Sequence, residues 1–397
     1  MANESSRFAI EAQCFDPSPP SRLKRKQNLI SAQALASSVR PVGSFSDPRA
    51  RRSFGISSVS VIGRRVEVTE RILHRRPFAN LIEFSGAVTI PHPILVVAPL
   101  SGSFPILLRD LVVDLLGHGK AVAVADWFDV RYVPREAGRF GLEEQILYVT
   151  EMIRVLGAGV HVIGVCQAVV PVLAATAFLA AVEPAKAPCS LVLVGGPVDP
   201  SANPTGVGRY LRAHSLKRFE NKLMNVVPPG WPGQGRSIYP KAIQLLSFNG
   251  YVARHLARGG ELRRKILVDD GEDPIHYPFS ALTLTMMDLP AEFVLDTIRC
   301  VFQDQDLVRG NLHLGGGKID LHAISRTALM TIEAAQDDIA APGQTHAAHA
   351  FCKSIPDSRR RHLLVPDCGH FSLFHGRTCR ARIVPEIIGF TQSAESC

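Results

Sequence analysis

The chain has 397 residues, of which 46% are hydrophobic and 20% are charged, and its net charge is +8. This balance is ordinary for a globular protein, so it excludes a chain that is disordered throughout, and the length allows one elaborated domain or two smaller ones. The cysteines are scattered, without a CxxC pair or a Cys/His cluster of zinc spacing. This spacing argues against a disulfide framework and favours free thiols in a reducing compartment.

Residues 1–53 are polar, rich in Pro and Ser and without a clear period, which predicts a disordered basic tail. Basic side chains gather between Ser21 and Arg64, where Asp47 is the only acid. This charge would suit an anionic surface or an organelle transit peptide, or it belongs to a solvated tail. The tail lacks the interleaved aromatic pattern of nucleic-acid binders, so we expect no nucleic-acid partner. No apolar signal core is present, so we expect no secretion by that route.

From Phe54 onward the pattern becomes that of a folded chain. The stretch SVSVIGRRVEVTERIL alternates apolar and polar residues around Gly63, which predicts a hairpin at a sheet edge. Short apolar runs then predict buried strands at 94–98, 121–125, 161–163, 190–194, 328–332 and 362–365. Helical spacing predicts helices at 104–116, 142–156 and 169–179. This alternation implies an α/β fold with a mostly parallel central sheet and helices on both faces.

The interval 199–325 breaks the alternation, because it holds Pro/Gly clusters, aromatic residues and only patches of helical pattern. We expect it to be a cap over the C-terminal edge of the sheet, inserted into a core of residues 54–198 and 326–397. The nearly uncharged segment 160–182 resembles a membrane span, but polar, Gly and Pro residues interrupt it. A buried strand and helix explain it better, so we expect no transmembrane segment.

The sharpest motif is Gly164-Val165-Cys166-Gln167-Ala168, which lies between an apolar strand and an apolar helix. It has the form of a nucleophile elbow, with Cys in the place of Ser and Ala in the place of the last Gly. Small flanking residues let strand and helix approach around a strained turn, and the helix N-terminus would activate the thiol and stabilise an oxyanion. The alternative is a buried structural cysteine, the commonest role of a free one.

An elbow nucleophile needs an acid and then a base later in the chain. Asp337 and Asp338 follow the next-to-last predicted strand, where the acid is expected, although either could be a plain turn former. His370 follows the last predicted strand in a Gly-His pair, where the base is expected, with His375 as its rival. Because the chain has 14 histidines, only position and order select His370.

An oxyanion hole needs two backbone N–H groups. Gln167, the residue after the nucleophile, would supply one, and Leu100 or Ser101 in the loop after strand 94–98 would supply the other. The Ser101 hydroxyl also precedes a helix, but it lacks the elbow pattern and is the weaker nucleophile candidate. No phosphate loop, dinucleotide fingerprint or metal-ligand spacing is present, so we expect no cofactor and no metal.

The chain resembles the intracellular polyhydroxybutyrate depolymerases, which are cysteine α/β-hydrolases related to the polyhydroxyalkanoate synthases. The resemblance runs from about Phe54 to Thr391 and rests on APLSGSFPILLRD, ADWFDVRYVP, GRFGLEEQI, HVIGVCQA, LPAEFVLDTIRCVFQ, QDDIAAPGQTHAAH and CGHFSLFHG. It implies an α/β-hydrolase fold with Cys166 as nucleophile and His370 as base. The acid of its DDI motif would be Asp337, with Asp338 as second choice.

Two motifs depart from the resemblance. Glu333-Ala334-Ala335 stands where Glu-Gly-Glu is expected, and Phe371-Ser372 stands where Tyr-Gly is expected, while residues 1–53 have no counterpart. These departures concern substrate preference and granule targeting more than the chemistry.

The resemblance implies a carboxylic ester hydrolase that cleaves poly(3-hydroxybutyrate)-type polyester through a thioester acyl-enzyme, in the cytoplasm at polyhydroxyalkanoate granules. A polyhydroxyalkanoate synthase or another acyltransferase could use the same triad, and a non-catalytic granule-binding protein is the remaining alternative. In the cap, Trp231, Tyr239 and Phe279 are expected to meet the apolar polymer or to be core. The sequence fixes neither the monomer preference nor the oligomeric state.

Overall fold

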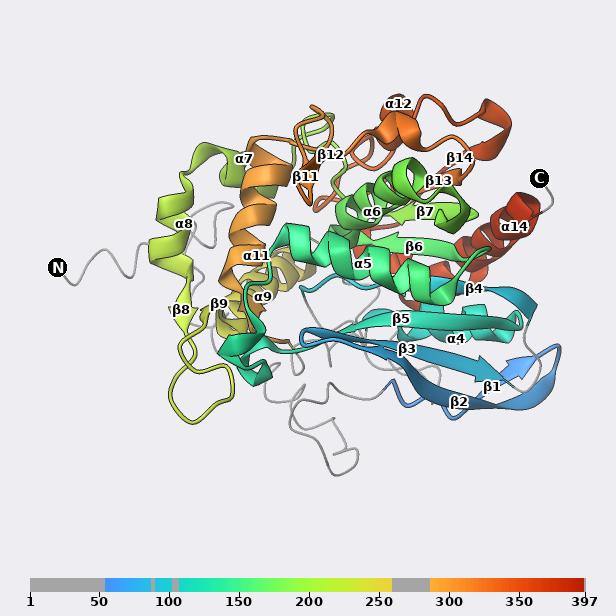
Figure 1. Ribbon diagram of the computed structural model, residues 1–397, viewed down its shortest axis with the longest axis horizontal. Coiled ribbons are helices and arrows are strands. Elements are labelled where there is room, and N and C mark those ends of the chain that lie inside the picture. The colour runs from blue at the N-terminus through green and yellow to red at the C-terminus, as the bar shows by residue number, and fades with distance from the viewer. Residues whose placement is uncertain (1–53, 87–89, 102–106, 259–285, 396–397) are drawn as a thin grey trace.

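A nine-stranded sheet with the order β1-β2-β3-β5-β4-β6-β7-β13-β14 lies at the centre of the computed structural model (Figure 1). The structure describes residues 54–86, 90–101, 107–258 and 286–395. The tail predicted at 1–53 lies outside the described residues. The strands of the sheet are β1 (Ser58–Val61), β2 (Arg64–Arg75), β3 (Ala79–Gly86), β4 (Ile90–Val97), β5 (Lys120–Trp127), β6 (His161–Val165), β7 (Ser190–Val194), β13 (Ala328–Ala334) and β14 (Arg360–Val365).

The strands from β5 to β14 in this order run parallel, whereas β1, β2 and β3 are antiparallel to their neighbours. The central strands β6 and β7 are buried along their whole length, because helices cover both faces of the sheet, and this explains their apolar sequences. Every strand predicted from the sequence is present, but the prediction that 362–365 is buried is wrong: β14 is largely exposed because it is the edge strand of the sheet. β4, β5, β6, β13 and β14 are longer than predicted.

β1 and β2 form the hairpin predicted at the sheet edge. Its two-residue turn has Ile62 at φ 49° and Gly63 at φ 73°. Positive φ at both positions is the geometry that matches the twist of a hairpin. The Ile62 side chain is 96% exposed, so packing does not compensate for its unfavourable backbone.

The helices that flank the sheet are α4 (Arg109–Gly117), α5 (Leu142–Leu156), α6 (Val169–Val182) and α14 (Val384–Glu395). α5 and α6 pack on each other over one face, and α4 and α14 pack on each other over the other face (Figure 1). α5 has the predicted bounds and α6 extends past its predicted end at residue 179. The predicted helix 104–116 is described from residue 107 onward, and there α4 begins at Arg109.

Between β7 and β13 the chain leaves the main sheet. The elements of this interval are α7 (Gly206–Ala213), α8 (Leu216–Leu223), β8 (Asn225–Val226), β9 (Ser237–Tyr239), α9 (Lys241–Arg258), β10 (Leu289–Pro290), α11 (Ala291–Asp296), a π-helical turn (Thr297–Gln303), β11 (His313–Leu314) and β12 (Gly317–Lys318). Its division from the core as a cap stays a prediction. Across the described ranges, no helix combines the length and apolar character needed to cross a membrane.

One buried ion pair fixes this interval to the core. Arg131, which follows β5, donates to the buried carboxylate of Asp288 at 2.9 Å. Its guanidinium also lies 4.8 Å from the ring centroid of Trp231, an arrangement that stabilises both the cation and the ring position. Trp231 further packs edge-on against Tyr132 at 5.3 Å, which gives it a structural role, and Phe279 lies outside the described residues.

The sheet therefore begins with antiparallel strands, and β5 lies between β3 and β4, out of chain order. A strand–turn–helix unit runs from β6 to α6. This arrangement is the α/β-hydrolase fold, as expected from the sequence.

Candidate active site

A strained turn carries Cys166 at the C-terminal end of β6. Val165 is still extended, but Cys166 has φ 54°, and a single helical turn then leads into α6. A positive φ is uncommon for a residue other than glycine and persists only where the surroundings enforce it. The turn has the geometry of the predicted nucleophile elbow, because it lifts the side chain off the sheet edge and directs it away from the strand.

Two glycines make this turn possible. A Cβ on Gly164 would lie 2.3 Å from Cγ2 of Val172, and a Cβ on Gly196 would lie 2.2 Å from the carbonyl oxygen of Cys166. Gly196 lies two residues after the end of β7, the strand that pairs with the elbow strand β6. Only residues without a side chain fit this close approach of β6, β7 and α6.

A hydrogen-bond relay holds Gly196 against the elbow. Thr345 Oγ1 accepts from the Gly196 N–H at 2.9 Å and donates to the Gly196 carbonyl at 2.8 Å. The buried Glu333 carboxylate in turn accepts from the N–H groups of Thr345 at 2.7 Å and of His346 at 2.9 Å. Glu333 thus keeps a positioning role in the motif that departs from the family pattern.

The predicted acid and base meet after β13 and β14. His370 Nδ1 lies 2.7 Å from Asp337 Oδ2, and the residues are 3% and 5% exposed. The other carboxylate oxygen, Asp337 Oδ1, accepts from the N–H groups of Ile339 at 2.8 Å and Ala340 at 2.9 Å. With both oxygens engaged, the carboxylate is fixed in position and can in turn fix the orientation of the imidazole.

The third side chain is Cys166, which lies close enough to His370 to raise the pKa of its imidazole. Because Nδ1 faces Asp337, Nε2 is the ring nitrogen left for the sulfur. Burial lowers the pKa of His370, but the Asp337 carboxylate and then Cys166 outweigh it, so this pKa lies well above its ordinary value. A histidine with such neighbours can take and hold a proton from the thiol. These side chains meet because β6, β13 and β14 are parallel and end at one edge.

The second-choice acid Asp338 and the rival base His375 differ in their surroundings from Asp337 and His370. The Asp338 side chain is 53% exposed and faces α9, where it lies 2.9 Å from Tyr251 Oη and 3.1 Å from His255 Nε2. Asp337, and not Asp338, therefore contacts the imidazole. The rival base His375 is fully buried at the start of α13 (Gly376–Thr378), whereas His370 carries both contacts of the site.

The loop predicted to complete the oxyanion hole lies next to the elbow. Val97, at the end of β4, is the register partner of Gly164. Trp127 Nε1 donates to the carbonyl of Ala98 at 2.9 Å and fixes the start of this loop. Leu100 is buried and Ser101 is half-buried, while residues 102–106 lie outside the described part. Gln167 is the middle residue of the helical turn Cys166–Ala168, and its role in an oxyanion hole stays a prediction.

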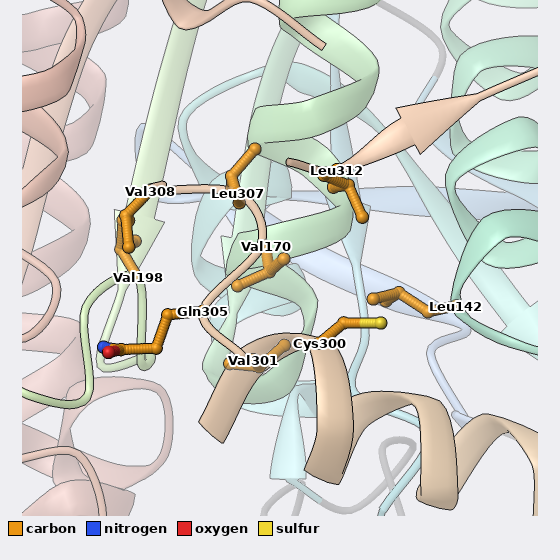
Figure 2. Close-up of a pocket in the computed structure, with 9 residues that line it drawn as sticks. All are labelled: Leu142, Val170, Val198, Cys300, Val301, Gln305, Leu307, Val308 and Leu312. Carbon is orange, nitrogen blue, oxygen red and sulfur yellow. The ribbon is translucent and has the colours of Figure 1, made fainter. Parts of the chain in front are cut away.

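The other described thiols differ from Cys166 in their surroundings. Burial raises the pKa of Cys300 and of Cys352 to about 12, so both stay protonated. Figure 2 shows Cys300 in a mostly apolar cavity that Val170 of α6 also lines, with the sulfur pointing towards Leu142. The cavity measures only about 10 Å³, which is close to the minimum for one water molecule. It is a packing defect between the π-helical turn and the core, too small for an ester substrate.

Sequence reasoning missed two groups beside the site. The first is α9, whose Tyr251 and His255 reach Asp338; their spacing of four residues was the only available signal. The second is a stack of three imidazoles at the β13–β14 pair, formed by His346, His349 and His362.

The imidazole stack is tied to β13, with His349 half-buried and His346 and His362 exposed. The ring centroids of His346 and His362 lie 4.3 Å apart, and Thr331 Oγ1 lies 2.9 Å from a ring nitrogen of both His349 and His362. Burial, and to a smaller extent the neighbouring His346 and His362, lower the pKa of His349 to about 4. His349 is therefore a neutral ring near neutral pH. Within the described ranges, no group of His, Cys, Asp or Glu side chains has the geometry to hold a metal ion.

The fold places the protein in the class of the α/β-hydrolases. Its family follows from a match of residues 195–395, more than half of the chain, to the family described as "PHB de-polymerase C-terminus". The chain belongs to this family of ester hydrolases. The matched segment contains Asp337 and His370 and begins after Cys166. No curated protein matches the chain.

Solved structures similar to the chain include several hydrolases. A thermophilic esterase from Thermogutta terrifontis is 13% identical, with 88% of this chain and 99% of that chain covered and a TM-score of 0.43. A hydrolase from Pseudomonas aeruginosa is 15% identical, with 83% and 98% covered and a TM-score of 0.45. A monoacylglycerol lipase of Paleococcus ferrophilus is 12% identical, with 83% and 99% covered and a TM-score of 0.45.

Proposed function

We propose that the protein hydrolyses the backbone esters of poly(3-hydroxybutyrate)-type polyester, with Cys166 as nucleophile, His370 as base and Asp337 as the acid that orients it. The observation that carries this proposal is that His370 hydrogen-bonds to the Asp337 carboxylate at 2.7 Å and is influenced on its other side by Cys166 of the strained turn. Family membership supports a polyester as the substrate class.

The first half of the reaction transfers the acyl group to sulfur. His370 takes the thiol proton, and the Asp337 carboxylate stabilises the resulting imidazolium. The Cys166 thiolate attacks the ester carbonyl. The backbone N–H groups of Gln167 and of Leu100 or Ser101 donate hydrogen bonds to the developing oxyanion. The ester C–O bond then breaks, and His370 gives its proton to the departing alkoxide, which leaves as the hydroxyl end of the polymer.

The second half restores the thiol. His370 takes a proton from water, the resulting hydroxide attacks the thioester carbonyl, the C–S bond breaks, and His370 returns the proton to the departing thiolate of Cys166. The products are a hydroxyacid, as oligomer or monomer, and the starting enzyme. No step requires a group other than these side chains, backbone N–H donors and water.

We extend the proposal to the place of action and the domain division. A polyester of this kind is stored as water-insoluble granules, so the enzyme would work at a granule surface, and the net charge of +8 favours an anionic one. Residues 54–198 and 326–397 would form the catalytic core, and residues 199–325 the cap that meets the polymer.

The test uses purified protein and amorphous polyhydroxybutyrate granules, with released 3-hydroxybutyrate as the readout. Cys166→Ala, His370→Ala and Asp337→Asn should each lower kcat by about 10⁴-fold, because the three groups act as a unit. Cys189→Ala is the matched control: Cys189 is another half-buried thiol, and burial raises its pKa. This control should retain full activity. Undiminished release by Cys166→Ala would refute the assignment.

The same preparation tests the alternatives. Polymer formation from 3-hydroxybutyryl-CoA, without net release of acid, would make the protein a synthase-like acyltransferase. Granule binding that the wild type and Cys166→Ala share equally, with no turnover by either, would make it a binding protein.

A further inference from the structure

The loop that carries Asp337 also carries a second, differently placed carboxylate. The Asp338 side chain points to α9 and accepts hydrogen bonds from Tyr251 Oη at 2.9 Å and from His255 Nε2 at 3.1 Å. Tyr251 and His255 are four residues apart and therefore lie on one face of α9, with ring centroids 4.2 Å apart. The Asp338 carboxylate thus accepts hydrogen bonds from two side chains on one face of α9.

The same helix face also contacts the residue after the base. Phe371, which follows His370, packs edge-on against Phe248 at 5.9 Å and against Tyr251 at 6.0 Å between ring centroids. Such edge-on pairs stabilise a defined geometry in addition to burying apolar area. Hence α9 contacts the immediate neighbours of both Asp337 and His370, although it is separated from them by more than 80 residues of sequence.

Two simpler explanations of Asp338 fit the contacts less well. An isolated surface ion pair contributes little, but here the carboxylate receives two hydrogen bonds and the helix is also held by aromatic packing. Direct tuning of the imidazole is disfavoured because the groups that shift the pKa of His370 are Asp337 and Cys166.

We propose that Asp338 is a positioning residue that holds α9 beside the active site, so that Phe248, Tyr251 and Phe371 form an aromatic wall against which the apolar polyester chain lies. The proposal rests on the proposed function for the identity of the substrate. Asp337 then serves the chemistry, and Asp338 serves the binding of the chain. The two adjacent aspartates thus let one loop contribute to both the reaction and the binding of the substrate.

The experiment separates substrate binding from turnover. Asp338→Asn, Tyr251→Phe and His255→Gln are assayed with soluble 3-hydroxybutyrate oligomers for kcat and KM, and hydrogen exchange of the α9 amides is followed in the same samples. Each variant should raise KM by about fivefold to tenfold and change kcat by less than about twofold, because only uniform binding is lost. The α9 amides should exchange faster, and Asp338→Glu should restore part of the effect.

Asp320→Asn is the matched control, because Asp320 also pairs with a histidine, His322, at 3.1 Å on the surface. It should leave KM and α9 exchange unchanged. Unchanged KM and α9 exchange in Asp338→Asn would overturn the proposal. A loss of kcat with a shifted pH profile and unchanged α9 exchange would also overturn it, because Asp338 would then act on the imidazole.

Failure of the proposed function can be told apart from failure of this inference. If Cys166→Ala retained full hydrolysis, the assigned chemistry would be wrong. Hydrogen exchange of α9 in Asp338→Asn would still report whether the carboxylate holds the helix, because that readout needs no turnover.

Discussion

Cys166 at the elbow and Ile62 at the hairpin turn have similar positive φ angles in opposite surroundings. Their φ angles are 54° and 49°, in the region that costs a residue with a side chain roughly 1–2 kcal/mol. Cys166 is enclosed by two glycines and the first turn of α6, which leave it no other conformation. Ile62 is 96% exposed, and only the turn itself holds it. The comparison teaches that backbone strain serves chemistry only where packing enforces it.

The largest expected effect comes from breaking the enclosure of the elbow. In Gly196→Ala the new Cβ would lie 2.2 Å from the carbonyl oxygen of Cys166, so the elbow must shift. We expect destabilisation by about 2–3 kcal/mol and a fall in kcat of about 100-fold, because small displacements of a nucleophile are costly. Denaturant unfolding and the granule assay measure the two effects.

Gly389→Ala in α14 is the control for this substitution. A Cβ there meets nothing within 4 Å, and the residue lies inside a helix. Its stability should stay equal or rise by up to about 1 kcal/mol. If Gly196→Ala behaved in the same way, the elbow would not depend on the close approach of β7.

A second prediction compares two inactive variants of the nucleophile. Glycine adopts a positive φ without cost, whereas alanine keeps the steric conflict. Cys166→Gly should therefore be more stable than Cys166→Ala by about 1 kcal/mol, the reverse of the usual order. The free energies of unfolding in urea decide this, and a more stable Cys166→Ala would show that the turn carries no strain.

The smallest effect is expected at the exposed turn. Ile62→Asn should stabilise the protein by about 0.5–1 kcal/mol, because Asn-Gly is a favoured pair in this type of turn. Activity should be unchanged. Ile72→Asn, at a partly exposed position inside β2, is the comparison and should be neutral or destabilising. Equal shifts of the unfolding midpoint in both variants would contradict the strain at Ile62.

The central sheet and the candidate residues that meet at its edge could be predicted from the sequence for identifiable reasons. Strands such as β6 and β7 are buried on both faces, so their continuous apolar runs mark them directly. Cys166 was recognisable because small residues surround it, and the order of nucleophile, acid and base selected His370 from many histidines. The hairpin followed from the alternation around Gly63.

Other features could not follow from the sequence, because they depend on contacts between distant segments. The choice between Asp337 and Asp338 depends on which carboxylate faces the sheet edge and which faces α9. The positive φ of Ile62 contradicts its own local preference and carries no signal. The imidazole stack depends on the register that pairs Thr331 with His362.

The half-buried His349 of that imidazole stack makes the stability of the folded protein depend on pH, separately from its chemistry. Because burial and its neighbours hold the pKa of His349 near 4, below the ordinary histidine value, the folded state binds fewer protons than the unfolded chain. The stabilising contribution is complete above about pH 6.5 and is lost as the pH falls towards 4. Acidification would thus weaken the contacts that His349 makes with Thr331 of β13. It would thereby destabilise β13 and β14, the strands that lead into the loops of Asp337 and His370.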